Sequence, residues 1–156
     1  MKCNSEIYKF ALGYLNIAEI AESKAVERDT FYHAYKANLA FSIELFLKCI
    51  EATSTERTIL RVGDAQITRL FSGSNIRGHE LDKIFGKLEQ DRRKILSEKF
   101  ESHPCNVTCS TLENILAELS DAFVKDRYAF EIGGITSSDP DTLLWTARFF
   151  KDALKP

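Results

Sequence analysis

The hydrophobic positions in the first third of the chain follow the 3.6-residue period of an α-helix. Two such runs, over residues 4–26 and 30–52, are separated by a charged junction at residues 27–29. Asn4 or Ser5 can cap the first helix. The second run is apolar on nearly all sides, which predicts a central, buried helix. Its apolar members are Phe31, Tyr35, Leu39, Phe41, Ile43, Leu45, Phe46, Leu47 and Ile50.

The pattern changes at about residues 57–71. Residues 58–62 and 66–70 favour β-strands, and Gly63-Asp64 between them suits a tight hairpin turn. Because a lone hairpin is only marginally stable, it must pack on the helices or on a partner. We therefore expect a small β-hairpin insertion over this segment, with a long irregular loop as the alternative.

The remaining sequence returns to helical periodicity. The expected helices cover residues 79–88, residues 91–102, a segment from Ser110 or Thr111 to the Gly133-Gly134 pair, and a segment that begins at Asp139-Pro140. The fold class is therefore all-α, a bundle of five to six helices with the hairpin inserted. A chain of 156 residues buries about two thirds of its unfolded surface. We accordingly expect one domain over residues 1–156.

The charge balance limits the classes of partner. The 21 Lys and Arg residues face 23 Asp and Glu residues, so any nucleic acid must be bound by a local patch. The apolar stretches are far shorter than the roughly 20 residues of a membrane span, so we expect no membrane association. The first ten residues contain no apolar signal segment, which predicts a cytoplasmic location. The four cysteines are then expected to be free thiols.

Polar residues interrupt the apolar helix over residues 30–52. Glu44 precedes Lys48 by four residues, the favourable spacing for an ion pair on a helix, and Asn38 lies one and a half turns earlier. These residues can form an internal pair or a solvated helix edge, because a paired charge avoids most of the cost of burial. They can equally form the polar floor of a binding groove.

A histidine stands at the expected start of the helix over residues 79–88. The His79 imidazole can cap free backbone amides at the helix start, or it can act as an acid or base near neutral pH. The preceding Gly78 allows another backbone to approach closely, which suits either role.

A basic and aromatic cluster, Lys125-Asp126-Arg127-Tyr128, falls late in the expected fifth helix. Arg127 can bind a phosphate while Tyr128 stacks on a base. Alternatively, the cations complement the helix dipole near the carboxyl end of the helix. The two roles are compatible.

Motifs for metals and cofactors are not found. His103, Cys105 and Cys109 supply one ligand fewer than a structural zinc site takes. The sequence also contains no phosphate-binding loop of the Walker type, no dinucleotide glycine fingerprint and no hydrolase nucleophile elbow. We therefore predict neither a metal site nor a cofactor.

Three segments resemble the bacterial HEPN (higher eukaryotes and prokaryotes nucleotide-binding) family. They are residues 37–50 (ANLAFSIELFLKCI), 78–85 (GHELDKIF) and 127–131 (RYAFE), and their order also matches. With the connecting helices, the resemblance covers roughly residues 4–152. It implies a helical bundle, a homodimer, and RNA or a nucleotide as the ligand. It further implies a toxin–antitoxin, defence or stress system, with an antitoxin or a nucleotidyltransferase-like protein as partner.

The HEPN family includes metal-independent ribonucleases as well as members that only bind. Active members carry an R-x(4 to 6)-H motif, whose arginine and histidine meet across the dimer to bind phosphate and assist attack by the 2′-hydroxyl. The chain contains one match, Arg28 to His33, but the family motif normally follows the histidine block near residue 79. At that later place, Arg127 has no histidine in the next seven residues. Either the site is relocated or the catalytic pair is lost.

Two hypotheses follow from the sequence and the resemblance. In the first, a HEPN-like module binds RNA or a nucleotide, with metal-independent RNA cleavage as an open alternative. Its catalytic candidates are Arg28 and His33, and its ligand-binding candidates are Asn38, Glu44, Lys48, His79, Arg127 and Tyr128. In the second, the chain is a non-catalytic, homodimeric interaction module. The apolar faces of the second, fifth and last expected helices then form the interface, and the hairpin docks another protein.

Overall fold

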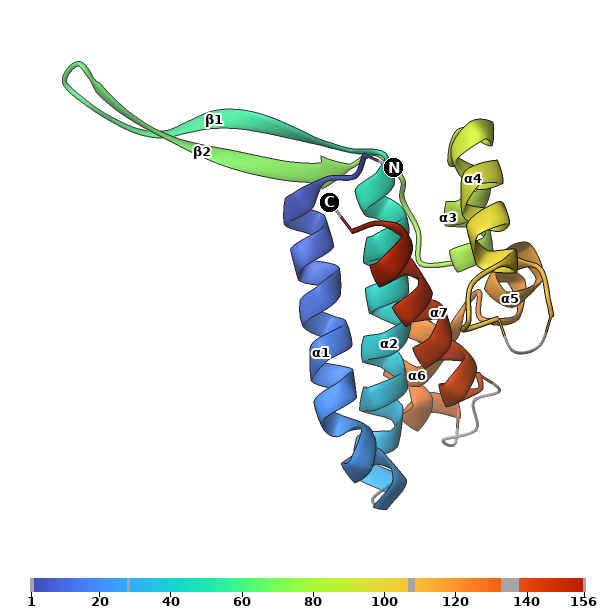
Figure 1. Ribbon diagram of the computed structural model, residues 1–156. Helices are drawn as coiled ribbons and strands as arrows, with labels where there is room; N and C mark the ends of the chain where they lie inside the picture. Colours follow the sequence, from blue (N-terminus) through green and yellow to red (C-terminus); the bar gives the residue numbers. More distant parts are fainter. Residues whose placement is uncertain (1, 28, 107–108, 133–137, 156) are drawn as a thin grey trace.

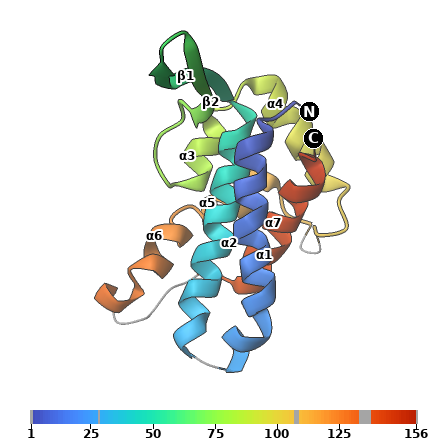
Figure 2. The same ribbon diagram turned by 90° about the vertical axis from the view of Figure 1, so that its left-hand side faces the viewer.

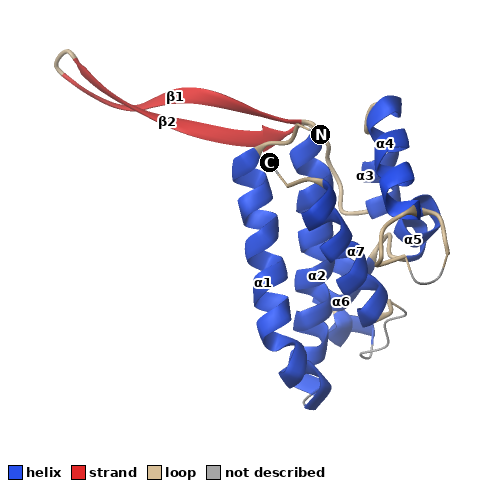
Figure 3. Cartoon of the chain, in the orientation of Figure 1, coloured by secondary structure: helices blue, strands red, loops and turns tan. Residues whose placement is uncertain are grey.

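The computed structural model describes residues 2–27, 29–106, 109–132 and 138–155 (Figure 1). Its elements are α1 (Ser5–Glu27), α2 (Asp29–Ile50), β1 (Ala52–Val62), β2 (Ala65–Ser74), α3 (Leu81–Gly86), α4 (Gln90–Glu101), α5 (Leu112–Glu118), α6 (Ala122–Arg127), the 3-10 helix η1 (Ala129–Ile132) and α7 (Pro140–Ala153). The expected helical bundle with one hairpin is confirmed (Figure 3).

The two long helices α1 and α2 run side by side in opposite directions (Figures 1 and 2). Asn4 caps α1, since its side-chain oxygen accepts from the amides of Glu6 (3.2 Å) and Ile7 (3.1 Å). The expected central position of α2 is also confirmed. Its Leu39, Ile43, Phe46 and Leu47 are fully buried, and its Ser42 hydroxyl donates to the Ala11 carbonyl at 2.9 Å.

Helix α7 closes the core against α1 and α2. Asp139 caps it by accepting from the Thr142 amide at 2.7 Å, and Pro140 occupies its first turn, as the sequence predicts. The Tyr8 hydroxyl donates to the Lys151 carbonyl at 2.9 Å and links α7 to α1. The two termini of the chain lie close together, near the base of the hairpin (Figure 2). The buried apolar residues form one continuous cluster.

The expected fifth helix is broken, so the prediction of one continuous helix was wrong. Helix α5 ends at Glu118, and α6 starts only at Ala122. The Ser120 carbonyl accepts from the Leu81 amide at 2.9 Å, and the Ser120 hydroxyl donates to Asp82. These bonds fix the turn between α5 and α6 on the start of α3. The break allows α6 to pack on α2. The expected stop at Gly133-Gly134 lies outside the described residues.

The hairpin is present and longer than the sequence predicts, so the alternative of an irregular loop was wrong. Strands β1 and β2 pair antiparallel from Ala52↔Ser74 to Val62↔Ala65, with an irregularity between Thr58 and Leu60. The turn needs Gly63, whose φ of +58° suits glycine. Both strands are exposed along nearly their whole length, and they project away from the helices (Figure 1).

Smaller predictions also have outcomes. Helix α4 matches its expected range within a residue, whereas α3 is shorter than the expected residues 79–88. All four cysteines are free thiols, as expected. In the described segments, no helix is long and apolar enough to cross a membrane.

Candidate functional site

A trough runs along one side of α2 and consists of three adjoining hollows. The upper hollow, ≈ 510 Å³, lies between α1, α2 and the segment after the hairpin. The lower hollow, ≈ 500 Å³, lies between α2, α6 and η1. The middle hollow shares Tyr14 and Phe41 with the upper one, and Asn38 and Arg127 with the lower one. The three hollows therefore form a continuous surface, which we call the trough.

Helical periodicity explains how α2 supplies the floor of the trough. His33, Ala37, Phe41, Leu45 and Lys48 all line it, at successive spacings of four, four, four and three residues. Side chains at these spacings lie on one face of a helix. The other faces of α2 are buried in the core, so one helix supports both the core and the trough.

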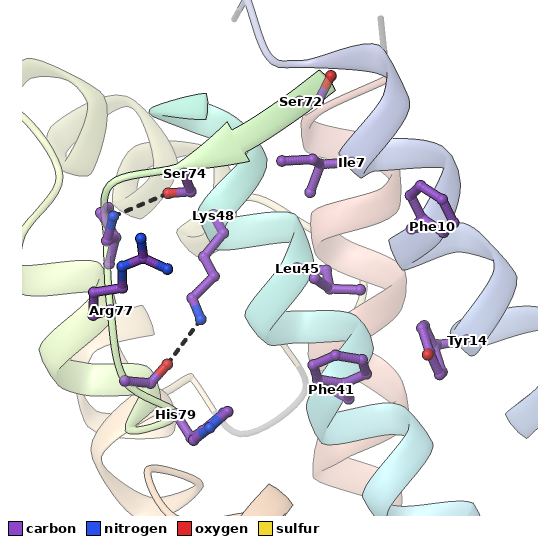
Figure 4. Close-up of a pocket in the computed structure, with 12 residues that line it drawn as sticks. Ile7, Phe10, Tyr14, Phe41, Leu45, Lys48, Ser72, Ser74, Arg77 and His79 are labelled. Atoms are coloured by element: carbon purple, nitrogen blue, oxygen red, sulfur yellow. Dashed lines mark hydrogen bonds between the residues drawn. The ribbon is translucent and has the colours of Figure 1, made fainter. Parts of the chain in front are cut away.

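An ionic network fixes the upper end of the trough. The expected pair is present, because the Lys48 ammonium donates to Glu44 Oε1 at 2.7 Å. Lys48 also donates to the Gly78 carbonyl at 2.8 Å, a contact visible in Figure 4. Glu44 is 1% exposed, and its second oxygen lies 2.9 Å from His79 Nδ1. Glu44 thus lies beneath the trough and holds two of its lining side chains.

The structure excludes one of the two expected roles of His79. The N-cap position of α3 is Glu80, and no side chain caps it, so the capping role was wrong. The His79 ring instead contacts Glu44, and half of its side chain is exposed (51%) at the mouth of the upper hollow. His79 is therefore available to a bound molecule.

A row of rings joins the upper and lower ends of the trough. Tyr14 packs edge-on against Phe41 at 4.7 Å between ring centroids, and Phe41 stacks on Phe123 at 4.8 Å. The His79 ring lies 5.2 Å from Phe123, and the Arg127 guanidinium lies 5.7 Å above the same ring. The row holds Arg127 in the middle of the trough by a cation–π contact.

A second ionic cluster fixes the lower end. Asp126 Oδ1 lies 3.1 Å from His33 Nδ1 and 3.3 Å from the Lys36 ammonium. The Ser138 hydroxyl donates to Asp126 Oδ2 at 2.8 Å. The side chains of Lys36 and Asp126 are fully buried, whereas that of His33 is 29% exposed. Burial and the nearby Asp126 carboxylate raise the pKa of the neighbouring Tyr32.

This cluster can perform acid–base chemistry. When Nδ1–H of a neutral His33 donates to Asp126, the Nε2 atom carries the free lone pair and can accept a proton. The carboxylate also stabilises the imidazolium that forms after proton transfer. Arg127 lines the same hollow as His33, so a cation that can bind phosphate accompanies the base.

Asp126 and Lys36 were not among the predicted site residues, although the sequence contains a signal for both. Asp126 lies four residues after Ala122 and three before Ala129, and both alanines are buried. Lys36 likewise precedes the buried Leu39 by three residues. Opposite charges on the buried faces of two helices predict an internal pair, because an unpaired buried charge is very unfavourable.

The predicted site residues fall into three groups. Those that line the trough are His33, Asn38, Lys48, His79 and Arg127. Glu44 lies beneath the trough, and Tyr128 lies beside it, with the Arg127 guanidinium 5.4 Å from its ring. Arg28 lies outside the described residues. Within the described ranges, no group of three or more metal-binding side chains is present.

Net charge in the trough comes from two arginines. Lys48 is paired with Glu44, and Lys36 is paired with Asp126. Among the described residues, neither Arg77 nor Arg127 forms a salt bridge with a carboxylate. The trough therefore combines two uncompensated cations with a row of aromatic rings.

The Glu44–Lys48 pair yields a stability prediction. We expect Glu44→Gln and Lys48→Met each to lower the free energy of unfolding by about 1–3 kcal/mol, because each leaves a largely buried partner without its counter-charge. The double variant should lose less than the sum of the two, with a coupling of at least about 0.5 kcal/mol. Urea denaturation measures all three. The exposed Glu6–Lys9 pair is the control, and its removal should change the free energy of unfolding little. Strictly additive losses at Glu44 and Lys48 would contradict the coupling.

Comparison with known proteins adds no assignment to this geometry. No protein family, curated protein or solved structure matches the chain. The likeness to HEPN domains thus depends on the three sequence segments, and the function has to be inferred from the trough.

Proposed function

We propose that the chain is a HEPN-like module whose trough binds single-stranded RNA or a nucleotide. The observation that carries this proposal is the placement of Arg127 over Phe123, in the middle of the trough and without a carboxylate partner among the described residues. A guanidinium in this setting binds phosphate, and the neighbouring rings offer faces on which bases stack.

The distribution of charge supports nucleic acid over other anions. Each stacked base contributes about 1–3 kcal/mol, and stacking does not depend on a strong overall positive charge. This suits a chain of net charge −2. Arg77 at the upper hollow and Arg127 at the middle one are separated by the aromatic row, so a strand laid along the trough would alternate phosphate contacts with stacking contacts.

The lower hollow supports metal-independent cleavage of the bound strand. In this reaction His33 accepts the proton of a 2′-hydroxyl, and the 2′-oxygen forms a bond to the adjacent phosphorus. The bond from phosphorus to the 5′-oxygen breaks, and the departing oxygen takes up a proton. The products are a 2′,3′-cyclic phosphate and a 5′-hydroxyl. Asp126 positions His33, and Arg127 replaces the expected Arg28 as the phosphate-binding cation in this scheme.

The cellular setting follows from the resemblance alone. We place the protein in a toxin–antitoxin, defence or stress system, with an antitoxin or nucleotidyltransferase-like protein as its partner. An RNA-binding trough that is open along its length can be blocked by such a partner. The cytoplasm is the corresponding location.

A second candidate function is a homodimeric interaction module, and an exposed stripe on α1 favours it. The stripe consists of Phe10, Gly13, Ile17 and Ile20, with the three apolar side chains 66%, 54% and 79% exposed. A side chain at Gly13 would meet nothing within 4 Å, so packing inside the chain does not require this glycine. A glycine inside a helix costs about 1 kcal/mol, and close approach of a second helix would explain it.

The interface expected from sequence was in part wrong. The apolar faces of α2 and α7 are buried in the core and cannot form an interface. An apolar helix face predicts burial but does not tell what buries it, and here the chain's own helices bury both faces. The exposed stripe of α1 is therefore the better candidate for a second copy of the chain.

Binding to the trough can be tested with labelled single-stranded RNA. We expect Arg127→Ala and Arg77→Ala each to weaken binding and to reduce the slope of log K against log salt by about 0.7, because each removes one phosphate contact. Fluorescence anisotropy at salt concentrations from about 50 to about 200 mM measures both effects. Lys94→Ala on the exposed face of α4 is the control. Equal affinity in all four proteins would refute the trough as the binding site.

Cleavage can be tested by incubating total RNA with the protein and a chelator. We expect wild-type protein to cleave, His33→Ala to lose cleavage while it still binds RNA, and Arg127→Ala to bind RNA more weakly and to lose cleavage. His103→Ala removes a histidine outside the trough and should cleave normally. Gel analysis with end-group mapping identifies the cyclic phosphate. RNA left intact by the wild-type protein would eliminate the cleavage step and leave the binding proposal to the previous test.

The homodimer candidate can be tested by light scattering after gel filtration. We expect the wild-type chain to be a dimer, and Ile17→Glu to be a monomer because it places a charge in the centre of the interface. Ile95→Glu changes an exposed residue of α4 and should leave the dimer intact. A monomeric wild-type chain at concentrations of tens of micromolar would dismiss the stripe as an interface.

A further inference from the structure

The hairpin carries a second group of cations, separate from the trough. We call residues 52–74 the arm. Alternation along its strands defines two faces. Ser72 and Ser74 line the trough, and Ser54 accepts a hydrogen bond from the Asn4 side chain at 2.7 Å, so these residues mark the inner face. The outer face carries Arg57, Arg69, Phe71, Leu60 and Ile67.

Two arginines on the outer face stand directly opposite each other. Arg57 pairs with Arg69 in the register, and both guanidiniums lie over the ring of Phe71, at 5.4 and 5.9 Å from its centroid. Like charges at opposite positions of two paired strands destabilise the pairing. In the described part of the chain, neither arginine forms a salt bridge, and Glu56 accepts from Thr68 on the inner face.

This arrangement is unfavourable for the arm alone and favourable once an anion is bound. Two guanidiniums that converge on one ring can share an anionic group through several charge-assisted hydrogen bonds. The bound anion removes the repulsion between the two cations. The Phe71 ring is 38% exposed, so an aromatic ligand can also contact it.

We infer that Arg57, Arg69 and Phe71 form an anion clamp for a backbone phosphate of the RNA strand as it leaves the trough. Strand β2 contributes to both sites. Ser72 lines the trough from the inner face, and Arg69 lies three residues away on the outer face, about 10 Å along the strand, so the RNA passes over the edge of β2 between them. Figure 1 shows the arm projecting from the upper end of the helices, and Ser72 and Ser74 at its base line the upper hollow.

The clamp takes a phosphodiester group in preference to a carboxylate. Beyond the arginines, the outer face continues with Leu60, Ile67 and Val62, which are 51%, 52% and 67% exposed. Exposed apolar side chains beside the arginine pair can contact the apolar faces of bases that flank a bound phosphodiester, whereas a lone carboxylate offers them no such surface. The inference rests on the proposed binding of RNA in the trough and extends the bound segment along the arm.

The length of the RNA separates the two sites experimentally. We would measure fluorescence anisotropy with labelled single-stranded oligonucleotides of about 4 and about 16 nucleotides. The shorter RNA fits within the trough alone, whereas the longer RNA can also reach the arm. The Arg57→Ala/Arg69→Ala variant should bind the longer RNA at least about tenfold more weakly and the shorter RNA with unchanged affinity. Arg61→Ala removes a charge from the same strand but from the inner face, and should change neither affinity by more than about twofold.

Folding of the arm has its own control. Removal of the opposed arginines relieves repulsion, so the double variant should melt at the same temperature as the wild-type protein or higher. A loss of affinity for the long RNA with unchanged melting is therefore a loss of the clamp. A lower melting temperature, with both RNAs bound more weakly, would overturn the clamp in favour of a structural role.

Failure of the inference differs from failure of the proposed function. Equal binding of the long RNA by the double variant and the wild-type protein overturns the clamp, while Arg127→Ala still reports on the trough. If the wild-type protein binds neither RNA, the proposed function fails as well. A last measurement uses poly-L-glutamate as a competing anion. If it binds more tightly than RNA and depends on Arg57 and Arg69, the occupant is an acidic protein segment and the phosphodiester assignment is overturned.

Discussion

Helix α2 has to satisfy two demands at once, and the rest of the structure depends on how it does so. Most of its circumference is buried and supplies the centre of the core. The remaining face forms the floor of the trough. Two charged residues of this helix, Lys36 and Glu44, are buried at opposite ends of the trough, and each is satisfied by a partner from another element or turn. Those partners, Lys48, His79 and Asp126, are side chains that line the trough.

The two buried ionic clusters determine position more than stability. Removal of charges from water offsets much of their attraction, so such clusters contribute little net free energy, whereas the apolar cluster supplies most of the stability. Their effect is geometric. Asp126 draws α6 onto α2 beside His33, and Glu44 holds His79 at the mouth of the upper hollow. Arg127 follows Asp126 in sequence, so the same contact that buries the carboxylate brings the guanidinium to the trough.

Periodicity and capping were sufficient to predict the elements with strong local signals. Helices α1 and α7 combine an apolar stripe with a cap, Asn4 for α1 and Asp139 for α7, and α2 is a long run that is apolar on nearly all sides. The break between α5 and α6 could not be predicted in this way, because the buried Leu119 and Ala122 keep a helical spacing across the turn. The hydrogen bonds of Ser120 to α3 decide the break, and they are long-range. The hairpin was underestimated because Ala52, Glu56 and Gly73 in its basal part are of residue types that are depleted in strands.

The candidate site shows the same division. The Glu44–Lys48 pair lies within one helix, so its spacing alone predicted it. Asp126 was attributed to a cationic surface cluster because its neighbours Lys125 and Arg127 dominate the local charge. Its role depends on His33 and Lys36, which are about ninety residues away in sequence. No local pattern places Arg127 in the hollow of His33. The sequence shows no histidine after Arg127, so the pairing of Arg127 with His33 comes only from the fold.

The arm shows how binding and folding are linked in this chain. A two-stranded hairpin that projects into solvent has little packing to stabilise it, and only its base is joined to the helices, through Asn4 and Ser54. Repulsion between Arg57 and Arg69 weakens it further. An anion can bind between the two arginines only while the strands are paired. Its binding would therefore shift the equilibrium of the arm toward the ordered hairpin. Under the proposed function, RNA held in the trough would raise the local concentration of phosphate at the arm, and each site would strengthen binding at the other without any change in the helical core.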